Sequence, residues 1–186
     1  MTERAADPRR LDLRRFARDG GVLRGAWSQD RFERLAASLM PPLADVPAPA
    51  VQWSAQGHQR AVQGADAEIW LHIQADTVVR LECQRCLQPL NAALQVVRNL
   101  RFVAGEDEAA RLDEESEDDV LVLVARLDLF ELLEDELILA LPLVPRHDTC
   151  PQPLDLSPAI ATPVADETRP NPFAALATWR VKPAAD

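Results

Sequence analysis

The chain of 186 residues is 47% hydrophobic, which suits a single globular domain with a buried core. Because it has no uncharged apolar run of about 18 residues and no apolar stretch after a basic start, we expect neither a membrane span nor a secretory signal. Its three cysteines fit a reducing cytoplasm better than a disulfide framework, and its net charge of −10 disfavours extensive binding to nucleic acid.

The first segment, residues 1–26, contains more arginines than acidic residues, although the whole chain has a negative net charge. Its first 18 residues contain six arginines and three acidic residues. Arginines at a chain end can contact phosphates and release counterions, but a solvated terminus explains them equally well. The charge pattern alone therefore leaves direct contact with RNA undecided.

A helix is predicted over residues 27–39, because Phe32 and Leu35 belong to an apolar stripe with helical spacing. Ser28 is its expected N-cap. Pro41 and the proline after it end the pattern, since proline cannot continue a helix. This is the N-terminal helix of the predicted fold.

Beyond residue 50 the apolar residues alternate, which is the spacing of half-buried strands. A polar break at Ala75 and Asp76 favours a hairpin of two strands within residues 68–83. A longer strand is expected after the cysteines, and the run at 120–124 is a further short strand. The alternating residues are Val51, Trp53 and Ala55, then Ile69, Leu71 and Ile73, then Val79, Leu81 and Cys83, and finally Leu94, Val96, Leu100 and Phe102.

The segment 105–119 is strongly acidic, with nine acidic residues and one arginine from residue 106 onwards. Such a run is typical of a solvated loop, and we predict a loop here. The functional alternative is an arm that docks onto a basic partner such as a ribosomal protein.

A second helix is predicted over 127–141. Asp128 is its expected N-cap, and Leu129 and Leu133 belong to its buried stripe. Successive acidic residues on a helix point in different directions, and no base or nucleophile is paired with them, so we expect no acid–base catalysis. Three acidic residues are expected in solvent, namely Glu131, Glu134 and Asp135.

The predicted organisation has three parts: the arginine-rich segment 1–26, a single α+β domain over 27–150, and a proline-rich tail over 151–186 with a short helix at 171–180. We expect an antiparallel sheet of about five to six strands, with an N-terminal helix, an acidic helix after the last strand and a short C-terminal helix. The sequence shows no internal repeat.

Two short segments carry metal-ligand spacing. Cys83 and Cys86 are two residues apart in "LECQRCLQPL", and His147 and Cys150 repeat that spacing in "RHDTC". Three thiols and an imidazole form a complete tetrahedral set for zinc, with no position left for water or substrate, so the site would be structural. Residues 87–146 separate the two pairs, and only the fold can bring them together.

Two other interpretations of the cysteines remain open. A redox pair requires its first cysteine at a helix start, and Arg85 would favour a thiolate, but the flanking sequence lacks a βαβ pattern. Reduced, half-buried thiols in a hairpin explain the spacing without any chemistry. His58 and His72 lie in predicted strands and are expected to be exposed. The chain has no phosphate-binding glycine loop and no serine elbow, so we expect no enzyme.

Three segments together resemble the YceD family, bacterial proteins named for the accumulation of large-subunit ribosomal RNA. They are "LECQRCLQPL" at 81–90, "EDELILALPLVPRHDTC" at 134–150 and "RPNPFAALATWR" at 169–180. Their order and spacing match the family, and so does the acidic stretch between the first two. The resemblance covers most of residues 10–180.

The resemblance implies a cytoplasmic, non-enzymatic ribosome-biogenesis factor that supports the accumulation or processing of large-subunit ribosomal RNA. Similar members have the CxxC, and some have a second cysteine-containing element, which favours one structural zinc at Cys83, Cys86, His147 and Cys150. This chain departs from the family in its few basic residues and its very acidic segment. We therefore expect a ribosomal protein or an RNA-processing factor as partner, and no small-molecule substrate. A CxxC thiol–disulfide oxidoreductase and a direct RNA-binding module are the alternatives.

Overall fold

The computed structural model describes residues 6–41, 46–64, 66–151 and 173–174. The chain divides into two compact units, Met1–Pro151 and Gln152–Asp186, and all the elements below belong to the first. The helix expected at 171–180 lies outside the described residues, apart from residues 173 and 174.

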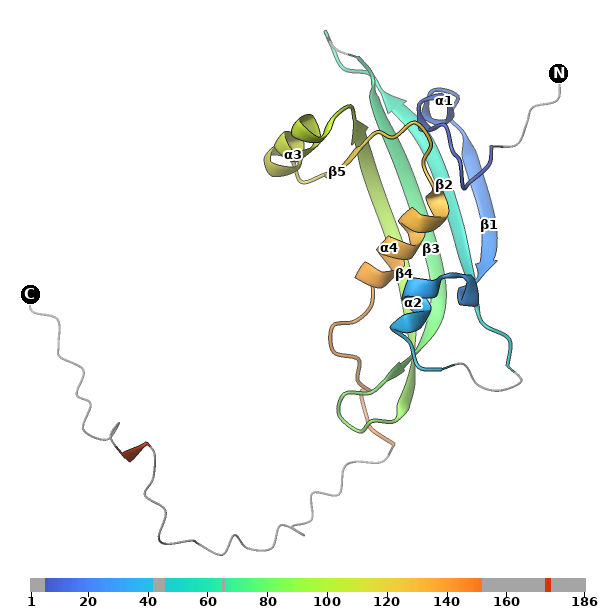
Figure 1. Ribbon diagram of the computed structural model, residues 1–186, viewed down its shortest axis with the longest axis vertical. Coiled ribbons are helices and arrows are strands. Elements are labelled where there is room, and N and C mark those ends of the chain that lie inside the picture. Colours follow the sequence, from blue (N-terminus) through green and yellow to red (C-terminus); the bar gives the residue numbers. More distant parts are fainter. Residues whose placement is uncertain (1–5, 42–45, 65, 152–172, 175–186) are drawn as a thin grey trace, which may run out of the picture. The chain divides into compact units, whose positions relative to one another are not determined.

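Five strands form one sheet in the order β1-β2-β3-β4-β5 (Figure 1). Their bounds are Val22–Ser28 for β1, Ala50–Arg60 for β2, Glu68–Glu82 for β3, Pro89–Val103 for β4 and Asp119–Val122 for β5. The first four strands are antiparallel neighbours, whereas β5 runs parallel to β4. The predicted α+β class is confirmed. One parallel pair breaks the expected antiparallel pattern, because a helix carries the chain from β4 to β5.

Three helices, α1, α2 and α4, contribute buried side chains to a core on one face of the sheet, and α3 follows β4 near the β5 edge (Figure 1). Their bounds are Leu13–Arg18 for α1, Glu33–Ala37 for α2, Glu106–Glu115 for α3 and Leu129–Leu139 for α4, with a 3-10 turn at Gln29–Arg31. None of the described helices combines the length and the hydropathy that a bilayer span requires.

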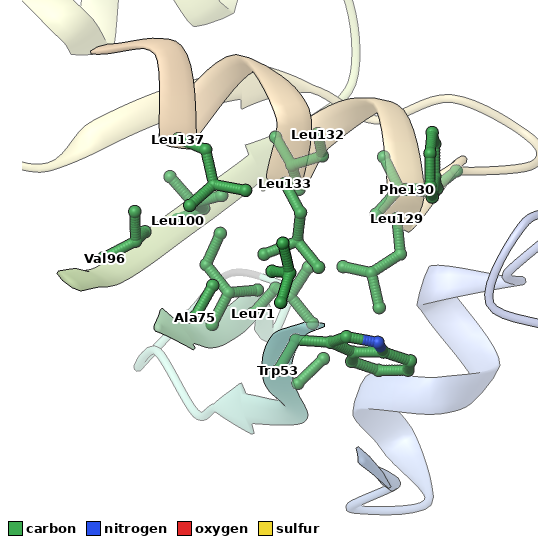
Figure 2. Close-up of a cluster of buried hydrophobic side chains, with 14 of the residues drawn as sticks. Trp53, Leu71, Ala75, Val96, Leu100, Leu129, Phe130, Leu132, Leu133 and Leu137 are labelled. Carbon is green, nitrogen blue, oxygen red and sulfur yellow. The ribbon is translucent and has the colours of Figure 1, made fainter. Parts of the chain in front are cut away.

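The helix α4 supplies much of the core, as its sequence predicts. Leu129, Leu133 and Leu137 are fully buried and point from α4 towards the sheet (Figure 2). The side chain of Asp128 accepts hydrogen bonds from the backbone N–H groups of Phe130 and Glu131, so the predicted N-cap is confirmed.

The N-terminal helix is shorter than predicted. Trp27 and Ser28 end strand β1, and α2 begins only at Glu33. Trp27 stacks on Trp53 of the neighbouring strand with 4.3 Å between ring centroids, and an aromatic pair across two strands stabilises the sheet at this point. The arginine-rich segment 1–26 itself contains α1 and β1.

The hairpin predicted at Ala75 and Asp76 does not exist, because β3 continues through both residues. Ala75 is 3% exposed and pairs with Trp53 on one side and Val96 on the other. Asp76 lies on the opposite, exposed face, where an acidic side chain leaves the strand intact. The turn of the hairpin comes later, at the cysteines.

Residues 106–115 of the acidic segment form the helix α3, where a loop was predicted. Glutamate, alanine, leucine and arginine are strong helix formers. Acidic residues in the first turn also stabilise the helix, because they interact favourably with the positive end of its dipole. Arg111 forms ion pairs with Glu108 and Glu115, one turn before it and one turn after it. These local ion pairs stabilise a helix in a run whose charge is typical of a loop.

The acidic residues of α4 are not all solvated. Glu134 is buried, with 6% of its side chain exposed, and pairs with Arg34. Glu136 is also buried and pairs with Arg98 of β4. A buried carboxylate requires such partners, and both arginines come from elements far away in the sequence.

Candidate metal centre

The cysteine pair lies in the turn that joins β3 to β4. The Cys83 N–H donates to the carbonyl of Gln88 at 3.0 Å, and the Leu87 N–H donates to the carbonyl of Cys83 at 2.8 Å. Leu87 adopts a positive φ of 58°, which tightens the turn after Cys86. Both thiols are directed inward by this turn and are buried.

The second pair reaches the turn along the segment after α4, which returns to this end of the sheet (Figure 1). The Gln84 N–H donates to the carbonyl of Pro145 at 2.8 Å. The backbone N–H of His147 then donates to the Sγ of Cys83 at 3.5 Å. Backbone bonds therefore place the two segments side by side.

The four predicted donors converge. Their ligand atoms, from Cys83, Cys86, His147 and Cys150, all lie within 4.8 Å of one another. The two Sγ atoms of Cys83 and Cys150 are 3.9 Å apart, and the Sγ of Cys86 is 3.5 Å from the Nδ1 of His147. In a tetrahedral zinc site the corresponding separations are about 3.8 Å between two sulfurs and about 3.6 Å between sulfur and nitrogen. The cluster can therefore hold one tetrahedral metal ion.

The histidine is oriented by a hydrogen bond outside the donor set. Its Nε2 lies 3.1 Å from the carbonyl oxygen of Pro89. A carbonyl only accepts, so we assign the proton to Nε2. The Nδ1 of His147 then presents its lone pair towards the thiols, as a metal ligand must.

Backbone dipoles prepare one thiol for a metal. Burial opposes ionisation of Cys83, but the N–H groups of His147, Arg85 and Cys86 outweigh it and lower the pKa of this thiol to about 5. Burial raises the pKa of Cys86, and the neighbouring thiols add to this effect. Since metal ligands must be deprotonated, the lowered pKa of Cys83 prepares this thiol to bind a metal ion.

Arg85 crosses between the two segments. Its Nε donates to the Sγ of Cys150 at 3.0 Å. Its Nη2 donates to the carbonyls of His147 at 2.7 Å and Asp148 at 3.2 Å. The bond to Cys150 raises the pKa of the guanidinium. From the sequence, Arg85 was expected only to favour a thiolate in the CxxC. Its position between the two cysteines was the only sequence signal for the contacts with His147, Asp148 and Cys150.

The arrangement does not match that of a redox CxxC. No helix starts at Cys83, since residues 83–88 form a turn and β4 follows at Pro89. Cys83 and Cys86 are 0% and 5% exposed, whereas thiol exchange needs an accessible sulfur.

The other two histidines do not approach this centre. The ring of His58 stacks on Trp70, with 6.2 Å between centroids. The Nδ1 of His72 is 2.7 Å from the side-chain oxygen of Asn99. Both histidines lie on strands, as the alternation predicted. His58 is exposed as expected, whereas His72 is half-buried.

The chain is similar to a known protein family over more than half of its length. A sequence model of the family described as large ribosomal RNA subunit accumulation protein YceD matches residues 71–179, which contain all four donors. The chain is 32% identical over 160 residues to the large ribosomal RNA subunit accumulation protein YceD of Haemophilus influenzae, a match that covers 85% of this chain and 87% of that protein. No solved structure matches. The chain therefore belongs to the YceD family.

Proposed function

We propose that this protein is a non-enzymatic, cytoplasmic factor of ribosome biogenesis that supports the accumulation or processing of large-subunit ribosomal RNA. The observation that carries the proposal is the likeness to the Haemophilus influenzae protein, whose name states a role in the accumulation of the large ribosomal RNA subunit and whose match covers 85% of this chain. The arrangement of the cysteines supports it, because a closed set of four protein donors suits a structural role and leaves no ligand position for a substrate.

One structural zinc ion is proposed at Cys83, Cys86, His147 and Cys150. The donor types are those that zinc prefers, and their separations agree with a tetrahedral ion. The ion would fasten the segment after α4 to the turn between β3 and β4. Elemental analysis of protein purified without added metal should find about one zinc per chain, and a Cys83→Ser variant should lose it. A metal-free wild-type protein would refute this part of the proposal.

A basic protein, such as a ribosomal protein or an RNA-processing factor, is the proposed partner. The helix α3 exposes carboxylates such as Asp107 and Glu114, which no arginine pairs with among the described residues. In α4, by contrast, Glu134 and Glu136 are buried in ion pairs within the protein. The acidic docking surface is therefore assigned to α3, where complementary charge would steer association with the partner.

Direct RNA binding through the N-terminal arginines is the weaker candidate. Five arginines lie among the described residues before Asp19, and three of them form ion pairs with carboxylates. Arg9 pairs with Asp128, and Arg15 and Arg18 both pair with Asp19. Paired arginines have less charge to offer to phosphates.

Depletion in the organism that makes the protein tests the function. The ratio of large-subunit to small-subunit ribosomal RNA should fall, and the wild-type gene should restore it. An unchanged ratio and an unchanged subunit profile would refute the proposed role.

The partner surface is tested by complementation of the depleted strain. A double variant, Asp107→Asn with Glu114→Gln, should restore the RNA ratio poorly, because it removes charge from α3. The matched control, Glu33→Gln with Glu131→Gln, removes the same charge from exposed positions on α2 and α4 and should restore it fully. Equal restoration by the two variants would exclude α3 as the docking surface.

A further inference from the structure

We propose that Arg85 is the residue that retains the metal in this centre, by holding the His147–Cys150 segment on the cysteine turn and by balancing the charge of the donor set. The inference rests on the proposed zinc site and names a residue outside the four ligands. It predicts that metal retention depends on one guanidinium that coordinates nothing.

The geometry of Arg85 supports the positioning role. It lies between the two cysteines of the turn, and its side chain bonds three atoms of the opposite segment: the Sγ of Cys150 and the carbonyls of His147 and Asp148. These bonds fix both ends of the His147–Cys150 segment relative to the turn. The guanidinium therefore preorganises the second pair of donors for the first.

The charges support the balancing role. A zinc ion with three thiolates and a neutral imidazole has one negative charge in excess. Arg85 supplies one positive charge, and it delivers that charge through a hydrogen bond to Cys150 at 3.0 Å. Cys150 is the most accessible of the three cysteines, since the other two are buried. The sulfur that a competing chelator reaches first is thus the one that Arg85 stabilises.

The shape of the arginine matters as well as its charge. Nε and Nη2 of Arg85 point at different atoms, the sulfur and the two carbonyls, and a planar fork can serve both. A lysine at this position would keep the charge but present a single ammonium group. The Arg85→Lys substitution therefore tests the planar donor geometry while it keeps the positive charge.

The experiment measures how fast the full-length, zinc-loaded protein loses its ion to an excess of a chromogenic chelator. Arg85→Gln should lose zinc about tenfold to hundredfold faster than the wild type, because removing a hydrogen-bond partner outside the ligand set weakens metal affinity by about that factor. Arg85→Lys should fall between the two. Arg146→Gln is the matched control, because Arg146 is exposed and precedes a ligand, and its side chain forms no ion pair with the described acidic residues. It should lose zinc at the wild-type rate.

The outcomes separate this inference from the zinc proposal. If the wild type contains no zinc, both are overturned. If the wild type contains zinc and Arg85→Gln loses it no faster than Arg146→Gln, only the role of Arg85 is overturned. Circular dichroism confirms that each variant folds. Should Arg85→Gln fail to fold, Arg85→Lys decides, and a wild-type rate for that variant overturns the inference.

Discussion

The buried carboxylate of Glu134 in α4 forms hydrogen bonds to the start of α2, and its removal tests how much they stabilise the protein. Its Oε1 accepts hydrogen bonds from the backbone N–H groups of Arg34 at 2.8 Å and Leu35 at 3.2 Å. Its Oε2 accepts from the Nε of Arg34 at 3.0 Å. One side chain thus satisfies two of the first backbone donors of α2, a helix of five residues that is too short to be stable alone.

Glu134→Gln keeps the size of the side chain and removes its charge. The amide oxygen can still accept from the two backbone N–H groups, but the amide nitrogen replaces Oε2 and faces the donors of Arg34. Arg34 has half of its side chain exposed and retains its ion pair with Asp135. The loss is therefore that of charge-assisted hydrogen bonds without a cavity, and we expect the free energy of unfolding to fall by about 2 kcal/mol.

Urea unfolding, followed by circular dichroism, measures this loss. For a unit of this size, an m-value of about 2 kcal/mol/M converts the expected change into a midpoint lower by about 1 M. Glu131→Gln removes the same charge from the exposed side of α4 and should shift the free energy by less than about 0.5 kcal/mol. Equal midpoints for the two variants would refute the reasoning that Glu134 caps α2.

Three further predictions concern the core, the packing of α1 and the thiols. Leu133→Ala removes a fully buried side chain of α4 and should lower the free energy of unfolding by about 3 kcal/mol in urea titrations. A loss below about 1 kcal/mol would contradict this, because it would mean that neighbouring side chains fill the cavity. Gly57→Ala should cost about 2 kcal/mol in the same assay, because its Cβ would lie 2.9 Å from the backbone of Ala17 in α1; an unchanged midpoint would contradict this close packing. In metal-free protein the ultraviolet absorbance of thiolate should show one group titrating at about pH 5, and Cys83→Ser should lack it. The pKa of Cys83 falls from 9.0 to about 5 on folding, so this thiolate stabilises the folded state fully above pH 9. That stabilisation is lost as the pH falls through 5. A thiolate titration only near pH 9 would contradict the hydrogen bonds assigned to Cys83.

Local sequence patterns predicted those elements whose residues decide their own conformation. The helix α4 follows from its leucine spacing and its Asp128 cap, and both appear in the structure. The strands β2 and β4 follow from alternation in the same way. The turn predicted at Ala75 and Asp76 is wrong, because a polar residue on the exposed face of a strand gives the same local sequence pattern as a turn. Which face is open depends on the helices that cover the other, and local sequence does not contain that information.

The acidic residues show a second limit of sequence patterns. The run after β4 suggested a loop because its net charge is high, yet the ion pairs of Arg111 within one turn on either side support the helix α3. Glu131, Glu134 and Asp135 were predicted to form a solvated stripe on α4, yet Glu134 is buried, and so is the neighbouring Glu136. Their partners, Arg34 and Arg98, come from distant parts of the chain, so charge alone could not assign them.

By itself, the sequence determined the chemical identity of the candidate centre: three cysteines and a histidine in two pairs of equal spacing. The segments that contain them, together with the segment at 169–180, also indicated the family. Only the tertiary structure decided that the pairs meet, because residues 87–146 lie between them and include β4, α3, β5 and α4. It also decided which histidine nitrogen faces the thiols, through the carbonyl of Pro89, and where the guanidinium of Arg85 lies. Donor types are properties of single residues, whereas their separations depend on the hairpin and on the return of the chain after α4.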